Sequence, residues 1–306
     1  MHKIKKTTLS NTFHITACPV CNSSQFSTFT AVPDWLVSKE VYTISQCTSC
    51  LFKFTSNAPT AENIGPYYNS EEYVEHSDTK SGVIYGVYHY ARTLMLKFKL
   101  SKIKKITNGK KLLDVGSGSG YFVNYMKQNS YDVTGVEISD KAIALCKTKF
   151  DIQAKSPEEF LAGKLDLDYD IISLWHVFEH VYTLDEYFDM FSKSLKKDGT
   201  LILALPNSDS ADAKIYGKYW AAYDTPRHLW HFTPATLSRF AEARGFTVVE
   251  KCRLPLDPFF NAMVSASYTP EFTFLPISVL KGLYSYIVSL FNKDKSSSLI
   301  YFLKKK

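Results

Sequence analysis

The segment from Asp114 to Gly120 has the residue types of a nucleotide-binding loop. It reads Asp-Val-Gly-Ser-Gly-Ser-Gly, follows the apolar run 112–115 and precedes a helical run at 121–127. Small residues let the backbone approach a ligand, and the amides at the start of the next helix can donate to it. A strand, a loop and a helix in this order are the context that such a site requires.

The spacing of the glycines distinguishes between two kinds of nucleotide. A dinucleotide site requires Gly-x-Gly-x-x-Gly, whereas this loop has Gly-x-Gly-x-Gly with Asp114 ahead of it. A carboxylate there would repel a pyrophosphate but would accept the ammonium of an amino-acid tail. Glu137 follows roughly 20 residues later, where a carboxylate can accept both hydroxyls of a ribose. The pattern favours a nucleoside with an amino-acid tail.

Four of the six cysteines form two Cys-x-x-Cys pairs with 25 residues between them. Two such pairs can supply four thiolates to one tetrahedral structural zinc, with free thiols or disulfides as the alternatives. Thiolates ligating a metal indicate a reducing compartment, and the first residues do not have the pattern of a signal peptide, so we expect a cytoplasmic protein. The predicted ligands are Cys18, Cys21, Cys47 and Cys50.

A first group of polar residues, Trp175 to His180, follows the apolar run 169–174. In a parallel sheet, ligands bind beyond the carboxyl ends of the strands, so these side chains should reach the pocket. His176 could deprotonate an acceptor hydroxyl. Alternatively, Glu179 and His180 could ligate a divalent cation that lowers the pKa of the acceptor. A third interpretation is that the group only caps the loop and lines the cofactor site.

A second polar group follows the run 200–205, on a loop at 208–232. Arg227 suits an anionic acceptor because its guanidinium can pair with a carboxylate or phosphate through two hydrogen bonds. The alternative is structural, with Asp224 and Arg227 holding the loop in place. The group consists of Trp220, Asp224, Pro226, Arg227, His228 and His231.

The remaining pattern predicts an α/β fold. Short apolar runs at 112–115, 133–137, 169–174 and 200–205 have the character of buried parallel strands, and further strands are expected at 246–250 and 297–303. Helices lie between them, with capping boxes expected at Ser156 with Glu159 and at Thr183 with Glu186. Alternating strands and helices predict a parallel sheet that is covered on both faces.

Three regions follow from these patterns. Residues 1–56 would form a zinc-ribbon-like module, 57–106 a linker with an amphipathic helix, and 107–306 the catalytic domain. Within the last region, 208–232 is the acceptor-side loop and 254–296 an apolar insertion that caps the site. Its apolar stretch 274–291 has Lys281 at its middle, so it should not span a bilayer, although it could contact a membrane surface or a partner.

From about residue 111 to its end, the chain resembles the class I S-adenosylmethionine-dependent methyltransferases, and most closely the ubiquinone-type members. The resemblance lies in LLDVGSGSG, VTGVEIS, DIISLWHVFEHV and LKKDGTLILALPN, in the order and spacing of that family. It implies a Rossmann-like sheet of seven strands, the last one antiparallel. The N-terminal cysteine region is similar to the zinc module of sugar C-methyltransferases. The implied function is methyl transfer from S-adenosylmethionine to a small-molecule acceptor, more readily to oxygen than to carbon.

The resemblance also implies which residues surround the cofactor. Asp114 and the glycine loop would hold the methionine and ribose part, Glu137 the ribose, and the turn at 156–158 the adenine edge. Tyr73 and His76 would close over the cofactor, and His176, His180, Arg227 and His228 would serve the acceptor side. The full set at the cofactor is Tyr73, His76, Asp114, Gly116, Ser117, Gly118, Gly120, Tyr121, Phe122, Glu137, Ile138, Ser156, Pro157, Glu158, Trp175, His176 and Glu179.

Net charge gives little support to the other functions considered. The chain has 306 residues and a formal charge of +6, part of which lies in lysines near its two ends. An RNA methyltransferase that uses the zinc module for binding is the alternative enzyme. It would require a basic stretch interleaved with aromatic residues, which the cysteine region lacks. A non-catalytic cofactor-binding or interaction protein is the third hypothesis.

Overall fold

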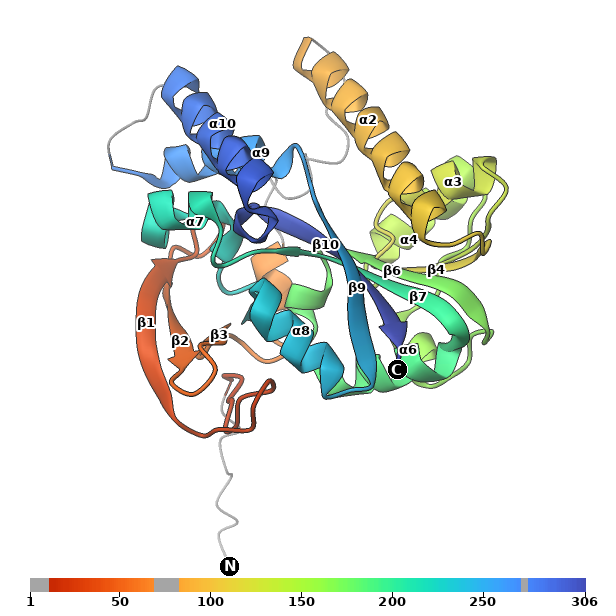
Figure 1. Ribbon diagram of the computed structural model, residues 1–306, viewed down its shortest axis with the longest axis horizontal. Helices are drawn as coiled ribbons and strands as arrows, with labels where there is room; N and C mark the ends of the chain where they lie inside the picture. The colour runs from red at the N-terminus through yellow and green to blue at the C-terminus, as the bar shows by residue number, and fades with distance from the viewer. Residues whose placement is uncertain (1–10, 69–82, 271–274) are drawn as a thin grey trace, which may run out of the picture.

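The central element of the protein is a six-stranded mixed sheet. The computed structural model describes residues 11–68, 83–270 and 275–306 (Figure 1). The strand order is β5-β4-β6-β7-β10-β9, and β10 runs antiparallel to both of its neighbours. The predicted antiparallel last strand is therefore confirmed. The strands are β4 (Lys111–Val115), β5 (Asp132–Val136), β6 (Tyr169–Trp175), β7 (Leu195–Pro206), β9 (Phe246–Arg253) and β10 (Ser298–Lys305).

The expected count of seven strands was one too high for the described part of the chain. At the β5 edge, Lys155 forms only an isolated parallel bridge with Val136. Pro157 begins helix α5 (Pro157–Leu161) two residues later, with Ser156 as its N-cap. Because the helix starts so soon, the segment has no length in which to continue as a strand.

Alternate residues of the strands pack into two separate apolar layers. Leu113 and Tyr301 belong to the layer under α5, α6 (Leu184–Ser194) and α8 (Pro234–Glu242). Leu112 and Phe302, their neighbours in sequence, belong to the layer under α2 (Val83–Ile106) and α3 (Tyr121–Gln128). Successive strand residues point to opposite faces, so continuous apolar runs bury both faces of the sheet, as predicted.

One of the two predicted helix capping boxes is confirmed. The Ser156 side chain accepts the Glu159 amide, and the Glu159 carboxylate accepts the Ser156 amide. Thr183 precedes α6 but makes no side-chain cap hydrogen bond, so the box with Glu186 was wrong. The backbone of Thr183 has ψ 70°, whereas Ser156 has ψ 158°, and only the extended conformation aims the hydroxyl at the first helical amides.

A second, smaller sheet joins the N-terminal region to the rest of the protein. Its order is β1-β2-β3-β8, and β8 (Trp230–His231) comes from the loop 208–232. Phe54 of β3 pairs with Trp230 of β8. The predicted module 1–56 therefore shares its sheet with the main domain. Its own strands are β1 (Phe26–Pro33), β2 (Val41–Cys47) and β3 (Lys53–Thr55).

The insertion 254–296 contains two helices, α9 (Asp257–Tyr268) and α10 (Leu275–Phe291), which pack on each other and on α7 (Ala211–Tyr216). In Figure 1, α10 and α2 project to the same side of the large sheet, α10 on the left and α2 on the right. No helix in the described ranges combines the length and apolar character needed to cross a bilayer. Helix α4 (Asp140–Phe150), which follows β5, contains the buried Cys146.

Candidate functional site

The glycine loop joins β4 to α3, and its three glycines differ in what a side chain at each position would contact. All three have positive φ, between 54° and 85°. A Cβ at Gly116 would lie 2.3 Å from Val177, and one at Gly120 would lie 2.4 Å from the Cys146 sulfur, so packing excludes a side chain at both. A Cβ at Gly118 would meet nothing within 4 Å. The backbone at Gly118 is therefore open on the side from which a ligand would approach.

Glu137 connects this loop to the end of β5. It is buried, its Oε2 accepts the Gly118 amide at 2.7 Å, and its Oε1 accepts the amides of Ile138 and Ser139 at 2.9 Å. Ile138 is exposed. A carboxylate held in this way keeps a fixed orientation next to the open face of Gly118. It is suited to accept hydroxyls of a bound nucleoside.

Asp114 is buried, and the half-buried Lys99 of α2 carries a positive charge close enough to interact with it. Burial raises the pKa of Asp114 to about 7, although the Ser173 hydroxyl, which donates to it at 2.5 Å, and the charge of Lys99 act in the opposite direction. Burial lowers the pKa of Lys99 to about 8, against the charges of Asp114 and Asp257. Sequence reasoning missed Lys99, because it is one of several lysines in α2 and nothing local distinguishes it.

His176, directly after β6, connects the candidate site to the insertion 254–296 through a contact with a carboxylate. Its Nε2 lies 3.2 Å from Oδ2 of Asp257, and its Nδ1 lies 3.5 Å from Oε1 of Glu179. Burial alone would lower the pKa of His176, but the two carboxylates outweigh it and raise the pKa to about 10. The imidazole is therefore a cation at neutral pH, which argues against its acting as the general base.

Glu179, His180 and His228 bring three potential ligand atoms within 4.8 Å of one another. Each histidine has its Nδ1 next to a backbone carbonyl, Arg227 at 3.0 Å for His180 and Ala222 at 2.8 Å for His228. An Nδ1–H that donates to a carbonyl leaves the lone pair on Nε2, which is the tautomer that a metal ion requires. Burial and the charge of His228 lower the pKa of His180 to about 4, so its imidazole is neutral.

The carboxylate of Glu179 is the least satisfied group of this cluster. The residue is 1% exposed, and within the described part of the chain neither oxygen has a hydrogen-bond partner. Its contact with His176 spans 3.5 Å, which is long for a hydrogen bond. A buried carboxylate without partners is costly unless a charged group or ion completes it.

Arg227 does not point toward a free anion site. It is 1% exposed and pairs through Nη2 with Asp34 at 3.0 Å and with Asp224 at 2.6 Å. Its Nη1 donates to the Tyr67 carbonyl at 2.9 Å. The two carboxylates raise its pKa. The geometry supports the structural alternative, in which Arg227 holds the loop 208–232 against the N-terminal region.

The other polar residues of that loop are buried in the same junction. The indole of Trp220 donates to Asp212 at 2.8 Å, and Nε2 of His231 lies 3.1 Å from the Thr55 hydroxyl. Near the cofactor loop, the rings of Phe122 and Trp175 are in edge contact at 5.3 Å. Tyr73 and His76 lie outside the described residues.

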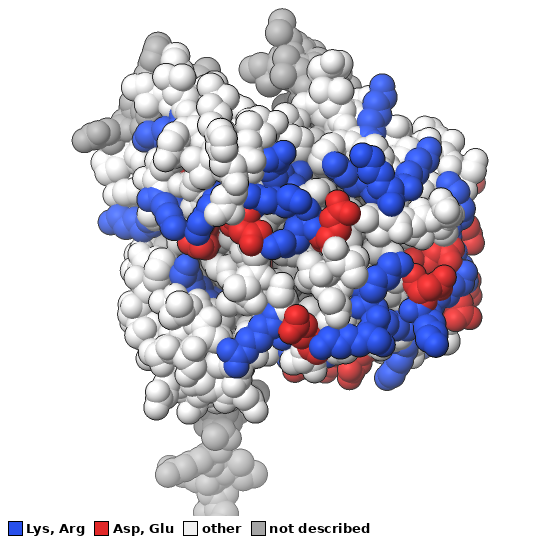
Figure 2. Space-filling view, viewed as in Figure 1, with Lys and Arg blue, Asp and Glu red and all other residues white. Residues whose placement is uncertain are grey.

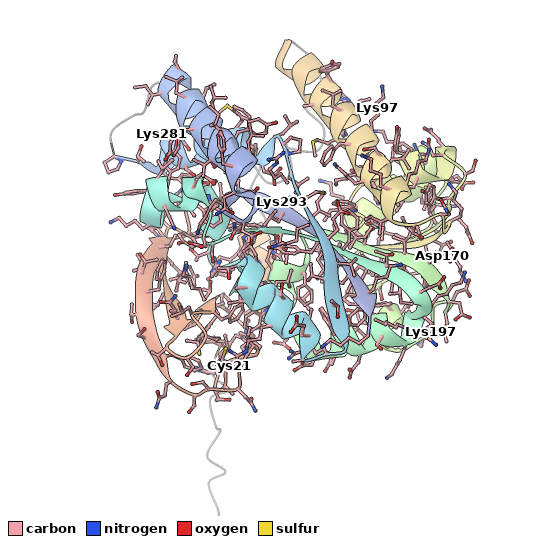
Figure 3. All side chains as sticks on the ribbon, in the orientation of Figure 1. Cys21, Lys97, Asp170, Lys197, Lys281 and Lys293 are labelled. Atoms are coloured by element: carbon pink, nitrogen blue, oxygen red, sulfur yellow. The ribbon has the colours of Figure 1, made fainter. Side chains whose placement is uncertain are left out.

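The four paired cysteines meet at the far end of the N-terminal sheet. The sulfurs of Cys18 and Cys50 lie 3.5 Å apart, as do those of Cys21 and Cys47, and all four lie within 4.8 Å of one another. These distances exceed a disulfide bond of about 2.05 Å and approach the roughly 3.8 Å expected around a tetrahedral ion with 2.3 Å bonds. Figure 3 shows Cys21 far from Lys281 of α10.

Residues 88–251, more than half of the chain, match the family model described as "Methyltransferase domain". The chain belongs to this methyltransferase family. The match covers β4 to β9 and the glycine loop, and its class is that of the S-adenosylmethionine-dependent methyltransferases, as the resemblance implied.

Two relatives are ubiquinone biosynthesis O-methyltransferases. One, from Nitrosospira multiformis, is 34% identical over 163 residues, which cover 49% of this chain and 68% of the relative. Another, from Pelagibacter ubique, is 32% identical over 117 residues, which cover 36% of this chain and 48% of the relative. The chain therefore spans about half to two thirds of the length of these relatives.

A solved structure supports the fold. Magnesium protoporphyrin IX methyltransferase from Synechocystis, crystallised with S-adenosylhomocysteine, superposes with a TM-score of 0.52 over 81% of this chain and 100% of its own. The sequence identity is 12%, so the likeness concerns the fold alone.

Proposed function

We propose that this methyltransferase binds S-adenosylmethionine at the β4–α3 loop and transfers its methyl group to an oxygen of a small-molecule acceptor. The observation that carries the proposal is the open backbone at Gly118 between Asp114 and Glu137, two buried carboxylates. S-adenosylmethionine supplies a methyl group on a sulfonium, which needs alignment and exclusion of water more than it needs a catalytic triad.

The residues that surround the loop fit such a cofactor. Glu137 would accept the ribose hydroxyls, and Asp114 the ammonium of the methionine part. Ile138 and the turn at 156–158 would flank the adenine. Oxygen is favoured as the acceptor atom because the ubiquinone relatives are named as O-methyltransferases.

Isothermal titration with S-adenosylmethionine and S-adenosylhomocysteine tests the cofactor site. We expect Glu137→Ala to weaken binding at least tenfold, because it removes the carboxylate that orders the Gly118 amide. Glu186→Ala, which removes an exposed carboxylate from the first turn of α6, is the matched control. Equal affinity in the wild type and in Glu137→Ala would reject this site. Formation of S-adenosylhomocysteine with a panel of hydroxylated metabolites would then identify the acceptor.

The acceptor side is proposed to use Glu179, His180 and His228 together. The buried Glu179 carboxylate, whose contact with His176 is long, and the two Nε2 atoms suit a divalent cation, which would lower the pKa of an acceptor hydroxyl. The pKa of His180, about 4, makes its imidazole a weak base, whereas the neutral ring can still ligate a metal ion. Activity measured after chelation and after addition of Mg²⁺, Mn²⁺ or Zn²⁺ distinguishes metal ligation from base catalysis. Activity that does not depend on metal would contradict the metal role and would leave base catalysis or substrate alignment as the mechanism.

The cysteine cluster is proposed to hold one structural zinc ion. Cys18 and Cys47 are buried in the same apolar layer as the main sheet, so the ion would stabilise both parts of the protein. We expect about one zinc per chain, lost in Cys18→Ser and kept in the control Cys146→Ser, whose thiol lies in α4. Four metal-binding thiolates also agree with the expected cytoplasmic location. A zinc content unaffected by Cys18→Ser would contradict the proposal.

A further inference from the structure

Helix α10 buries small residues against the protein and exposes large apolar residues on its outer side. The buried positions include Ser278, Gly282, Ser285 and Ser289. A Cβ at Gly282 would lie 3.0 Å from the Phe259 backbone, so α9 and α10 approach closely along these small residues. This packing leaves several of the large apolar side chains of α10 exposed.

The outward side of α10 is one continuous apolar stripe. The exposed large residues follow the spacing i, i+3, i+4, i+7, i+10 and i+11, which places them on one face of a helix. Eleven of the twenty exposed large apolar residues of the described chain lie between positions 256 and 291. Scattered exposed apolar residues are ordinary, but a contiguous set marks a contact surface. The stripe consists of Leu280, Leu283, Tyr284, Ile287, Leu290 and Phe291.

The helix that carries this stripe has a positive charge and no negative one. Helix α10 contains Lys281 and no acidic residue, and the single acid of α9, Asp257, faces His176. The neighbouring α2 has six basic residues and no acidic one. Figure 2 shows the surface over α10 as mostly white, with Lys and Arg side chains and a few acidic ones along its lower border, and in Figure 3 Lys281 of α10 and Lys97 of α2 lie at the same end of the molecule.

We propose that the stripe on α10, together with the lysines beside it, docks on the surface of a lipid bilayer that carries anionic headgroups. The stripe would enter the boundary between headgroups and acyl chains, while Lys281 and the exposed Lys97 of α2 contact the phosphates. The charge pattern favours this occupant over a second copy of the chain. A self-contact along α10 would desolvate Lys281 of both copies, and this helix offers no carboxylate to pair with them.

The docked helix pair leads directly to the candidate site. Asp257 at the start of α9 contacts His176, and Lys99 of α2 lies 4.1 Å from the Trp175 ring centroid. Helices α9 and α2 therefore both reach the carboxyl end of β6. Docking would turn this end of the sheet toward the membrane.

Flotation of the full-length protein with vesicles tests the proposal without any assay of activity. We expect binding to phosphatidylcholine vesicles that contain phosphatidylglycerol, and weaker binding to phosphatidylcholine alone. The double variant Leu283→Glu with Ile287→Glu should bind about tenfold more weakly. The matched control is Leu167→Glu with Val249→Glu, which adds the same charge at exposed apolar residues elsewhere. Lys281→Glu should reduce the preference for the anionic vesicles.

Three results would overturn the proposal. The first is a wild-type protein that stays in the vesicle-free fraction with both lipid compositions. The second is binding that both double variants retain equally, which would place the contact on another surface. The third is a dimer in sedimentation velocity that the α10 variant converts to a monomer, because the stripe would then be an interface between copies. Circular dichroism of each variant confirms that it is folded.

Discussion

Oδ2 of Asp257 lies 3.2 Å from Nε2 of His176, so the first residue of helix α9 in the apolar insertion contacts the first residue after strand β6. Eighty residues of chain separate the two. Glu179 adds a second carboxylate on the other ring nitrogen, at 3.5 Å. The imidazole is held between them in its charged form and joins the insertion to the candidate site.

The pair predicts a stability difference that depends on pH. The pKa of His176, about 10 in the folded protein, lies above the ordinary histidine value of 6.5. The stabilisation is therefore fully present below about pH 6.5 and disappears as the pH rises through about 10. Since the His176 side chain is 39% exposed, Asp257→Asn should cost no more than about 1 kcal/mol. Urea unfolding of the wild type and of Asp257→Asn at pH 6, 8 and 10 measures the difference in unfolding free energy. A difference that grows with pH would contradict the pairing.

The raised pKa of Asp114, about 7, predicts that cofactor affinity rises with pH. Below pH 7 the carboxyl is largely protonated and cannot attract the cationic methionine part. The dissociation constant for S-adenosylmethionine should therefore increase below pH 7, by up to about tenfold per pH unit. Titration calorimetry at pH 6 and pH 8 measures the change. Asp114→Asn should bind weakly at both, and a wild-type affinity that does not change between them would exclude this role.

Gly116 and Gly118 differ in what an added methyl group would meet, although both have positive φ. Gly116→Ala would drive a Cβ into Val177 and should destabilise the protein by about 1–3 kcal/mol. Gly118→Ala meets no protein atom and should cost only about 1 kcal/mol of backbone strain. Its methyl group would instead occupy the open face of the loop, so we expect it to impair cofactor binding. Thermal unfolding and calorimetry of both variants provide the comparison, and unchanged affinity in Gly118→Ala would mean that the cofactor lies elsewhere.

Arg227 is predicted to act on stability. Arg227→Met leaves Asp34, which is fully buried, without its positive partner, and should cost about 3–5 kcal/mol of unfolding free energy. Adding Asp34→Asn should restore part of that loss. If Arg227→Met instead unfolds like the wild type and only raises the KM of an anionic acceptor, the original anion-binding hypothesis is correct.

Much of the main domain could be predicted from local sequence. Buried parallel strands are continuous apolar runs, and the glycine loop has a fixed spacing because a backbone that approaches a ligand tolerates no side chain. The strand at 200–205 was recognised but starts earlier, at Leu195, and the Thr183 cap depended on a backbone angle that composition does not set.

Long-range packing decided the rest. No local signal shows that Phe54 pairs with Trp230, that the charge of Lys99 acts on Asp114, or that Arg227 is neutralised by Asp34 across nearly two hundred residues. The sequence alone determined the α/β class, the cofactor loop and the pairing of the cysteines, because each depends on residues close together in the chain. The tertiary structure decided whether each polar side chain faces the site or pairs with another segment of the chain. Burial and charge pairing depend on which distant segments meet.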